Sequence, residues 1–160
     1  MSTFGQALVS YAKTKLGQKE QGGENMGPIV DWSFALWTKR KPDETGWSKW
    51  CCGFASTCIY YTLVDLAMLQ EAKDWLKKGS LSCTSFYNKN ADCITPGKTP
   101  YVGSLILFGK DASNLHHIGI VTGVDTTYVY TIEGNAGNAV REKKYLLTDD
   151  DIYCYILLNY

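Results

Sequence analysis

The first half of the chain places apolar residues at the spacing of an α-helix. From Thr3 to Leu16 the apolar positions fall near helical period, and Gly17 follows as a stop signal. Pro28 suits the first turn of a second helix. A third segment, beginning at Cys51 or Cys52, has a broad apolar face that predicts a central, mostly buried helix. The expected helices are Thr3 to Leu16, Ile29 to Trp37, Cys51 to about Leu69, and Glu71 to Lys78.

After Pro100 the pattern changes to short runs rich in β-branched and aromatic residues, which indicate strands. The expected strands are Tyr101 to Phe108, His117 to Val124, Tyr128 to Ile132, a weaker Lys143 to Leu146, and Ile152 to Leu158. Between the halves, Ser80 to Thr99 is expected to be irregular, with a turn at Pro96-Gly97. Helices followed by strands predict an α+β fold with an antiparallel sheet. Without a repeat or a linker, residues 1–160 are expected to form one domain.

Composition narrows the classes of function. Hydrophobic residues make up 45% of the 160 residues, enough for a real core, and the formal net charge is zero. The balanced charge gives no support for nucleic-acid binding, and no apolar run is long enough to span a bilayer. We see no signal peptide at the N-terminus, so synthesis in the cytoplasm is expected. Aromatic residues, at 13%, favour a surface that grips an extended polymer or peptide.

Six cysteines are present, but no Cys-x-x-Cys pair occurs among them. The two histidines are adjacent, which argues against a structural zinc site. The acidic run Asp149-Asp150-Asp151 lacks an alternating spacing and is interpreted as a solvated loop. We therefore expect no metal and no cofactor. Cys83 and Cys93 flank a polar loop and form the first pair to consider for a disulfide.

Cys51 and Cys52 stand where a loop becomes a helix. The first N–H groups of a helix lack intrahelical partners, and the helix dipole is positive there, so a thiol at this position ionises more easily. One interpretation is a catalytic cysteine. The other is that both cysteines are small buried residues, since free cysteine is among the most buried residue types.

The strand half offers a partner for such a thiol. If the turn after the second expected strand centres on Asp125, paired residues have numbers that sum to about 250, which sets His117 directly across from Glu133. A carboxylate there would orient the imidazole. Asn135 would point the same way if the strand continued, and His116 should face away. The alternative for this pair alone is a surface ion pair.

Taken together, a cysteine at a helix start, a histidine and a glutamate form the nucleophile, base and orienting group of a papain-type thiol hydrolase. Several stretches then resemble one family, the CHAP amidase/endopeptidases, a branch of the NlpC/P60-like peptidoglycan hydrolases. They are Gly17-Gln18-Lys19-Glu20, Asn25 to Val30, Trp50-Cys51-Cys52-Gly53-Phe54, Ala72 to Gly79, Val102 to Phe108, His117 to Val121, and Tyr130 to Asn135. The resemblance implies a papain-like fold with the nucleophile helix packed on the C-terminal sheet.

The resemblance also implies roles for single residues. The family pattern puts the nucleophile directly after tryptophan, which selects Cys51, and it maps His117 to the base, Glu133 to the orienting residue and Asn135 to an auxiliary polar group. Two residues depart from it: Cys52 stands where a small residue without a thiol is usual, and Ser104 replaces an aspartate. Three aromatic residues are expected to line a groove for a sugar–peptide strand: Trp47, Trp50 and Tyr101.

The expected reaction is hydrolysis of an amide bond in bacterial peptidoglycan, as an amidase or an endopeptidase, leading to wall lysis after release or injection. A separate wall-targeting protein or an inhibitor partner stays open. Three alternatives share either the catalytic residues or the wall ligand with this prediction. They are an injected amidase toxin with a cognate inhibitor, a cysteine protease acting on proteins, and a domain that binds wall peptide without catalysis. A redox protein is less consistent, because Cys51-Cys52 lacks the two-residue spacer of thioredoxin-like motifs.

Overall fold

The expected order of helices before strands is confirmed in the structure of the chain, a computed structural model that describes residues 3–39, 49–90 and 94–160. Within these residues no helix is long and apolar enough to cross a membrane. The elements are α1 (Thr3–Lys13), α2 (Pro28–Phe34), α3 (Cys51–Asp65), α4 (Leu69–Lys78), α5 (Cys83–Lys89), β1 (Ile94–Gly97), β2 (Leu105–Gly109), β3 (Leu115–Val124), β4 (Tyr128–Glu133), β5 (Arg141–Leu146) and β6 (Ile152–Leu158).

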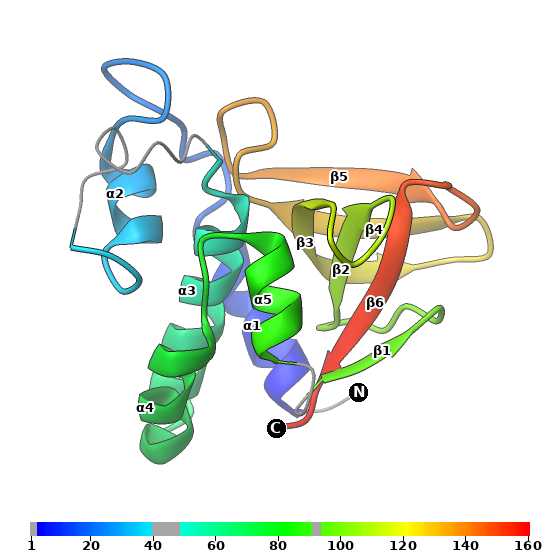
Figure 1. The fold of residues 1–160 in the computed structure, drawn as a ribbon, viewed down its shortest axis with the longest axis horizontal. Coiled ribbons are helices and arrows are strands. Elements are labelled where there is room, and N and C mark those ends of the chain that lie inside the picture. Colours follow the sequence, from blue (N-terminus) through cyan, green and yellow to red (C-terminus); the bar gives the residue numbers. More distant parts are fainter. Residues whose placement is uncertain (1–2, 40–48, 91–93) are drawn as a thin grey trace.

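The strands form one antiparallel sheet in the order β1-β6-β2-β3-β4-β5. Figure 1 shows the helices gathered on one side of the molecule and the sheet on the other. Along β2 every residue is buried. Leu105 and Leu107 join the large core shared with the helices, whereas Ile106 and Phe108 join a smaller cluster on the other face. The fold is therefore α+β, as the sequence predicts.

Helix α3 is the centre of the helical half, as its broad apolar face predicts. It contacts α1, α2, α4 and the sheet, and Phe54, Ile59 and Leu63 are fully buried. The helix ends at Asp65, whereas the sequence predicts an end near Leu69. The reason is a left-handed residue, Ala67 (φ 57°), after which Met68 N–H donates to the carbonyl of Leu63. Glycine usually takes that place, so the sequence carries no clear stop signal.

The expectation that Ser80 to Thr99 is irregular was wrong. Helix α5 forms there, with the Ser82 hydroxyl accepting from the N–H of Ser85 (3.2 Å) and Phe86 packed edge-on against Trp75. Strand β1 pairs with β6, so Pro96 and Gly97 lie in an edge strand and not in a turn. Both elements are short and depend on tertiary partners, which local patterns do not show.

The end of β4 touches α3 at a glycine. A Cβ at Gly134 would lie 2.5 Å from the Cβ of Phe54, far inside van der Waals contact. At Gly123, in β3, a Cβ would lie 3.6 Å from the Tyr130 ring, an ordinary contact. The close approach at Gly134 thus sets how near helix α3 lies to the sheet.

We predict that Gly134→Ala destabilises the protein by about 1–3 kcal/mol, because overpacking a rigid contact forces the helix and the strand apart. Urea denaturation followed by circular dichroism measures the change. Gly123→Ala is the matched control and should change the free energy of unfolding by less than about 0.5 kcal/mol. Equal stability of the two variants would show that the helix and sheet are not in close contact at Gly134.

Candidate active site

The start of α3 opens into a cleft. Cys51 is the first residue of the helix, Trp50 is its N-cap, and the cleft beside Cys51 has a volume of about 480 Å³. Cys51 lines this cleft, whereas Cys52, which is fully buried, does not. Successive side chains on a helix point about 100° apart, so only one of two neighbours can face the cleft.

His117 lies between Cys51 and Glu133. Its Nε2 is 2.7 Å from Oε2 of Glu133, and the Nε2–H donates a hydrogen bond to that carboxylate. The thiol of Cys51 also forms a hydrogen bond with His117, and the ring nitrogen left for it is Nδ1. The structure therefore brings together the three residues that the sequence nominates as nucleophile, base and orienting group, from the start of α3, from β3 and from the end of β4.

The predicted register of the β3–β4 hairpin was off by two residues. Ile120 pairs with Ile132 and Val121 with Thr131, and the ladder shifts between Val121 and Gly123. If the pairing of Ile120 with Ile132 continues by one residue, Glu133 lies opposite Gly119. A Cβ added at Gly119 would lie 2.9 Å from Cγ of Glu133. His117 reaches Glu133 diagonally, across the space that Gly119 leaves open. The predicted contact between His117 and Glu133 is still made, because a register error of two residues leaves both side chains on the same face of the sheet.

Glu133 is buried, with 1% of its surface exposed, and accepts hydrogen bonds from three side chains. Besides His117, Thr131 donates to Oε1 (2.5 Å) and the Tyr145 hydroxyl donates to Oε2 (3.0 Å). Burial and the neighbouring Glu133 raise the pKa of Tyr145 above its usual value, so the phenol keeps its proton and remains a donor. A buried carboxylate is tolerated when its oxygens are satisfied in this way.

Thr131 and Tyr145 were missed by sequence reasoning. Thr131 precedes Glu133 by two residues and so shares its face of β4, a signal that was available. Tyr145 comes from β5, the strand with the weakest pattern, and only the sheet places it near Glu133.

The contacts of His117 favour its protonated form. Burial alone would lower the pKa of His117, but the hydrogen bonds and charges of Cys51 and Glu133 outweigh it and raise the pKa to about 10. The imidazole ring is 5.7 Å from the ring of Phe108 and is about one-fifth exposed. A proton taken from the thiol would thus be held on a ring that the carboxylate stabilises.

A third cysteine touches the nucleophile candidate. Cys83, at the start of α5, is a buried free thiol that contacts both Cys51 and Cys52. Its hydrogen bond with Cys51, together with burial, raises the pKa of Cys51, and His117 acts in the opposite direction. Cys93, the first partner to consider for a disulfide with Cys83, lies outside the described residues, and Cys83 is a free thiol in the structure. Local patterns gave no hint of this contact.

Two of the three aromatic residues expected in the groove, Trp50 and Tyr101, do not line the cleft. Trp50 is fully buried, and its indole N–H donates to Oε1 of Glu20 (2.8 Å), so it fixes the loop before α3 and does not face substrate. Tyr101 is exposed but does not line the cleft. The residues that follow it, Gly103 and Ser104, form backbone hydrogen bonds with Val121 of β3 and not with the residues around His117. Trp47 lies outside the described residues.

Two polar positions of the sequence prediction also differ in detail. Strand β4 ends at Glu133, so Asn135 does not continue it: it lines the cleft from a turn with φ 58°, a conformation that asparagine tolerates. Ser104, where an aspartate was expected, is buried, donates to the carbonyl of Tyr101 (2.6 Å) and accepts from its N–H (3.2 Å). It closes a turn and does not reach the cleft.

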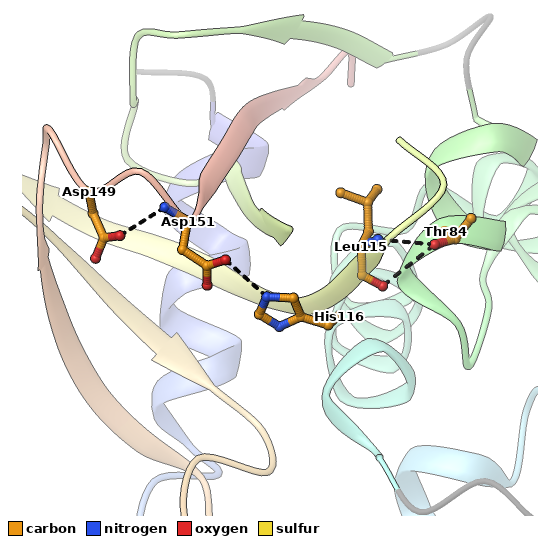
Figure 2. A network of polar contacts seen from close by, with 5 residues as sticks. All are labelled: Thr84, Leu115, His116, Asp149 and Asp151. Carbon is orange, nitrogen blue, oxygen red and sulfur yellow. Dashed lines mark hydrogen bonds and ion pairs between the residues drawn. The ribbon is translucent and has the colours of Figure 1, made fainter. Parts of the chain in front are cut away.

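His116 does not face away from the cleft, contrary to expectation. Phe108 pairs with His117 and Gly109 with Leu115, so His116 is the extra residue of a β-bulge, which re-aims its side chain. As Figure 2 shows, His116 binds Oδ1 of Asp151 (3.1 Å), whose N–H donates to Asp149. His116 and Asp151 both line the cleft, so the acidic run forms part of its rim and is not only a solvated loop.

The same figure shows how α5 is tied to the strand beside the site. The Thr84 hydroxyl accepts from the N–H of Leu115 (3.2 Å) and donates to its carbonyl (3.5 Å), one residue before His116. Helix α5 thereby holds Cys83 and the start of β3 in one unit.

Comparisons with known proteins bear on the family and the fold of the chain. A family model described as the CHAP domain matches residues 40–135. The crystal structure of Ly7917 matches with a TM-score of 0.53 and 16% identity, covering 98% of this chain and 63% of that one. The crystal structure of Ly7917 with the hydrolyzing product of MDP matches with a TM-score of 0.50 and 14% identity, covering 96% and 62%. The chain thus spans less than two thirds of these neighbours. The search of curated proteins found no match.

We predict that removing the Glu133 carboxylate lowers the pKa of His117. In Cys51→Ala/Glu133→Gln both groups that raise the pKa are gone, and burial alone should bring it below the ordinary value of 6.5. NMR titration of the ring protons measures this. Cys51→Ala alone is the control and should keep the pKa above 6.5. Equal values in the two variants would show that Glu133 does not stabilise the imidazolium.

Proposed function

The chain belongs to the CHAP domain family, and on that premise we propose that it is a cysteine hydrolase of peptidoglycan. The observation that carries the proposal is the line of contacts in the cleft from the Cys51 thiol to His117 and on to the buried Glu133. A domain that only bound wall peptide would not need a nucleophile, a base and an orienting carboxylate in contact.

The proposed reaction begins with the Cys51–His117 pair: a neutral His117 takes the Cys51 proton at Nδ1, or His117 already holds that proton as an imidazolium beside the Cys51 thiolate. The sulfur attacks the carbonyl carbon of a substrate amide, and Glu133 stabilises the imidazolium that forms. The developing oxyanion would accept hydrogen bonds from N–H groups in the first turn of α3, which have no intrahelical partner. His117 then gives its proton to the leaving nitrogen, the C–N bond breaks, and water hydrolyses the remaining thioester.

The substrate class rests on the family resemblance and on the Ly7917 complex, which holds a product of MDP, the usual abbreviation of muramyl dipeptide. We propose that the bond cleaved is an amide of the peptide part of peptidoglycan, either where the peptide joins the sugar or within the peptide. We further propose that the protein acts on the bacterial wall after release or injection and that lysis is the outcome.

Four proteins test this proposal: wild type, Cys51→Ala, His117→Ala and Cys52→Ala. Each is incubated with purified peptidoglycan, and the soluble products are identified by mass. New amine termini should appear with wild type, fall by at least about 10³-fold in Cys51→Ala and His117→Ala, and persist in Cys52→Ala, whose side chain does not line the cleft.

The product masses separate the two proposed bonds, since an amidase frees whole peptides from the sugar and an endopeptidase divides the peptide. Absence of soluble products from every wall type would contradict the substrate class. Activity retained in Cys51→Ala but lost in Cys52→Ala would contradict the choice of nucleophile. Cleavage of unfolded proteins in place of peptidoglycan would identify a protease.

A further inference from the structure

A second hollow opens beside the active-site cleft. It has a volume of about 420 Å³ and shares Glu24 and Asn138 with the cleft, so the two form one groove. Its other walls include Lys19 and Arg141. None of the residues assigned to catalysis lines it. A substrate that places its reacting amide at Cys51 can therefore extend past Asn138 toward two basic side chains.

Backbone hydrogen bonds hold these two cations close together. Lys19 pairs with Ala139 in an isolated antiparallel bridge, flanked by bonds from Glu20 N–H to Asn138 (2.9 Å) and from Val140 N–H to Gln18 (2.8 Å). Arg141 is two residues beyond Ala139, so it is the diagonal neighbour of Lys19. Diagonal neighbours in such a ladder are about 7–8 Å apart, a spacing at which two long side chains can reach one anion.

Both cations are free to bind a ligand. Neither Lys19 nor Arg141 has an ion-pair partner among the residues that the structure describes, and both are exposed. Two carboxylates, Glu20 and Glu24, also line the hollow, and Glu20 accepts hydrogen bonds from the Trp50 indole and from the N–H of Asn25 (2.8 Å each). Gly137 lies next to the guanidinium, where a Cβ would make an ordinary contact, 3.6 Å from Cζ of Arg141.

We propose that this hollow is a subsite for a free carboxylate on the peptide part of the substrate. Arginine presents a fork of N–H donors that matches a carboxylate, and lysine adds a second charge. The proposal rests on the proposed function for its substrate and adds a preference for a charged over an amidated peptide.

Muramyl dipeptide is a suitable probe because its peptide end carries one free carboxylate. Its affinity and that of its terminal carboxamide are measured by NMR titration of Cys51→Ala, which binds without cleaving. The same pair is measured for Cys51→Ala with Lys19→Gln, with Arg141→Gln and with both. Lys73→Gln, an exposed lysine of α4 outside both hollows, is the matched control.

The carboxylate ligand should bind Cys51→Ala about tenfold more tightly than the carboxamide, as expected for a charge-assisted pair. The preference should fall several-fold with either glutamine and vanish with both, while Lys73→Gln keeps it. A second pair of longer stem peptides, amidated at the end and differing only in a side-chain carboxylate or carboxamide, tells a side-chain carboxylate from a terminal one.

Equal affinity for both members of each pair overturns the subsite, as does no binding of any ligand at millimolar concentration. A preference that the two glutamine variants leave unchanged also overturns it. These results are separable from failure of the proposed function. If wild type cleaves no peptidoglycan but the preference persists, the subsite stands. If wild type cleaves peptidoglycan and no preference exists, only the subsite falls.

Discussion

The site depends on one buried carboxylate. Glu133 is almost wholly removed from water, and its oxygens are filled by donors from His117, Thr131 and Tyr145. Three neighbouring strands must pair in register for these donors to converge, because His117 belongs to β3, Thr131 to β4 and Tyr145 to β5. An unpaired carboxylate in this place would carry a large desolvation cost. The geometry of the imidazole is therefore a consequence of the sheet.

The nucleophile side of the cleft is held by a second carboxylate in a comparable way. Glu20 accepts from the indole of Trp50 and from the N–H of Asn25, so one side chain anchors the residue before Cys51 and the loop that forms a cleft wall. Trp50 is therefore a packing residue that holds the start of α3 in place. The close contact of Gly134 with Phe54 then fixes the distance between this helix and the sheet.

Cys51 and His117 titrate as a coupled pair, so the pKa of each depends on the protonation of the other. Cys83 and burial raise the pKa of Cys51, while the charge and hydrogen bond of His117 lower it. The high pKa of His117 has the complementary cause, since the ring is stabilised as a cation by its two partners. In the proposed reaction the proton therefore moves between two groups in contact at the wall of the cleft.

The sequence by itself determined the fold class, the central helix and the identity of the cysteine, histidine and glutamate that come together. The fold class, the central helix and the His117–Glu133 pair follow from local period and side-chain parity, and parity is unchanged by a register error of two residues. The choice of Cys51 over Cys52 came from the resemblance to the family pattern. The tertiary structure alone decided what depends on packing: helix α5 and strand β1, the bulge that turns His116 into the cleft, the contact of Cys83 with Cys51, and the burial of Trp50. These contacts join residues far apart in the chain, where no local pattern records which partner each side chain will meet.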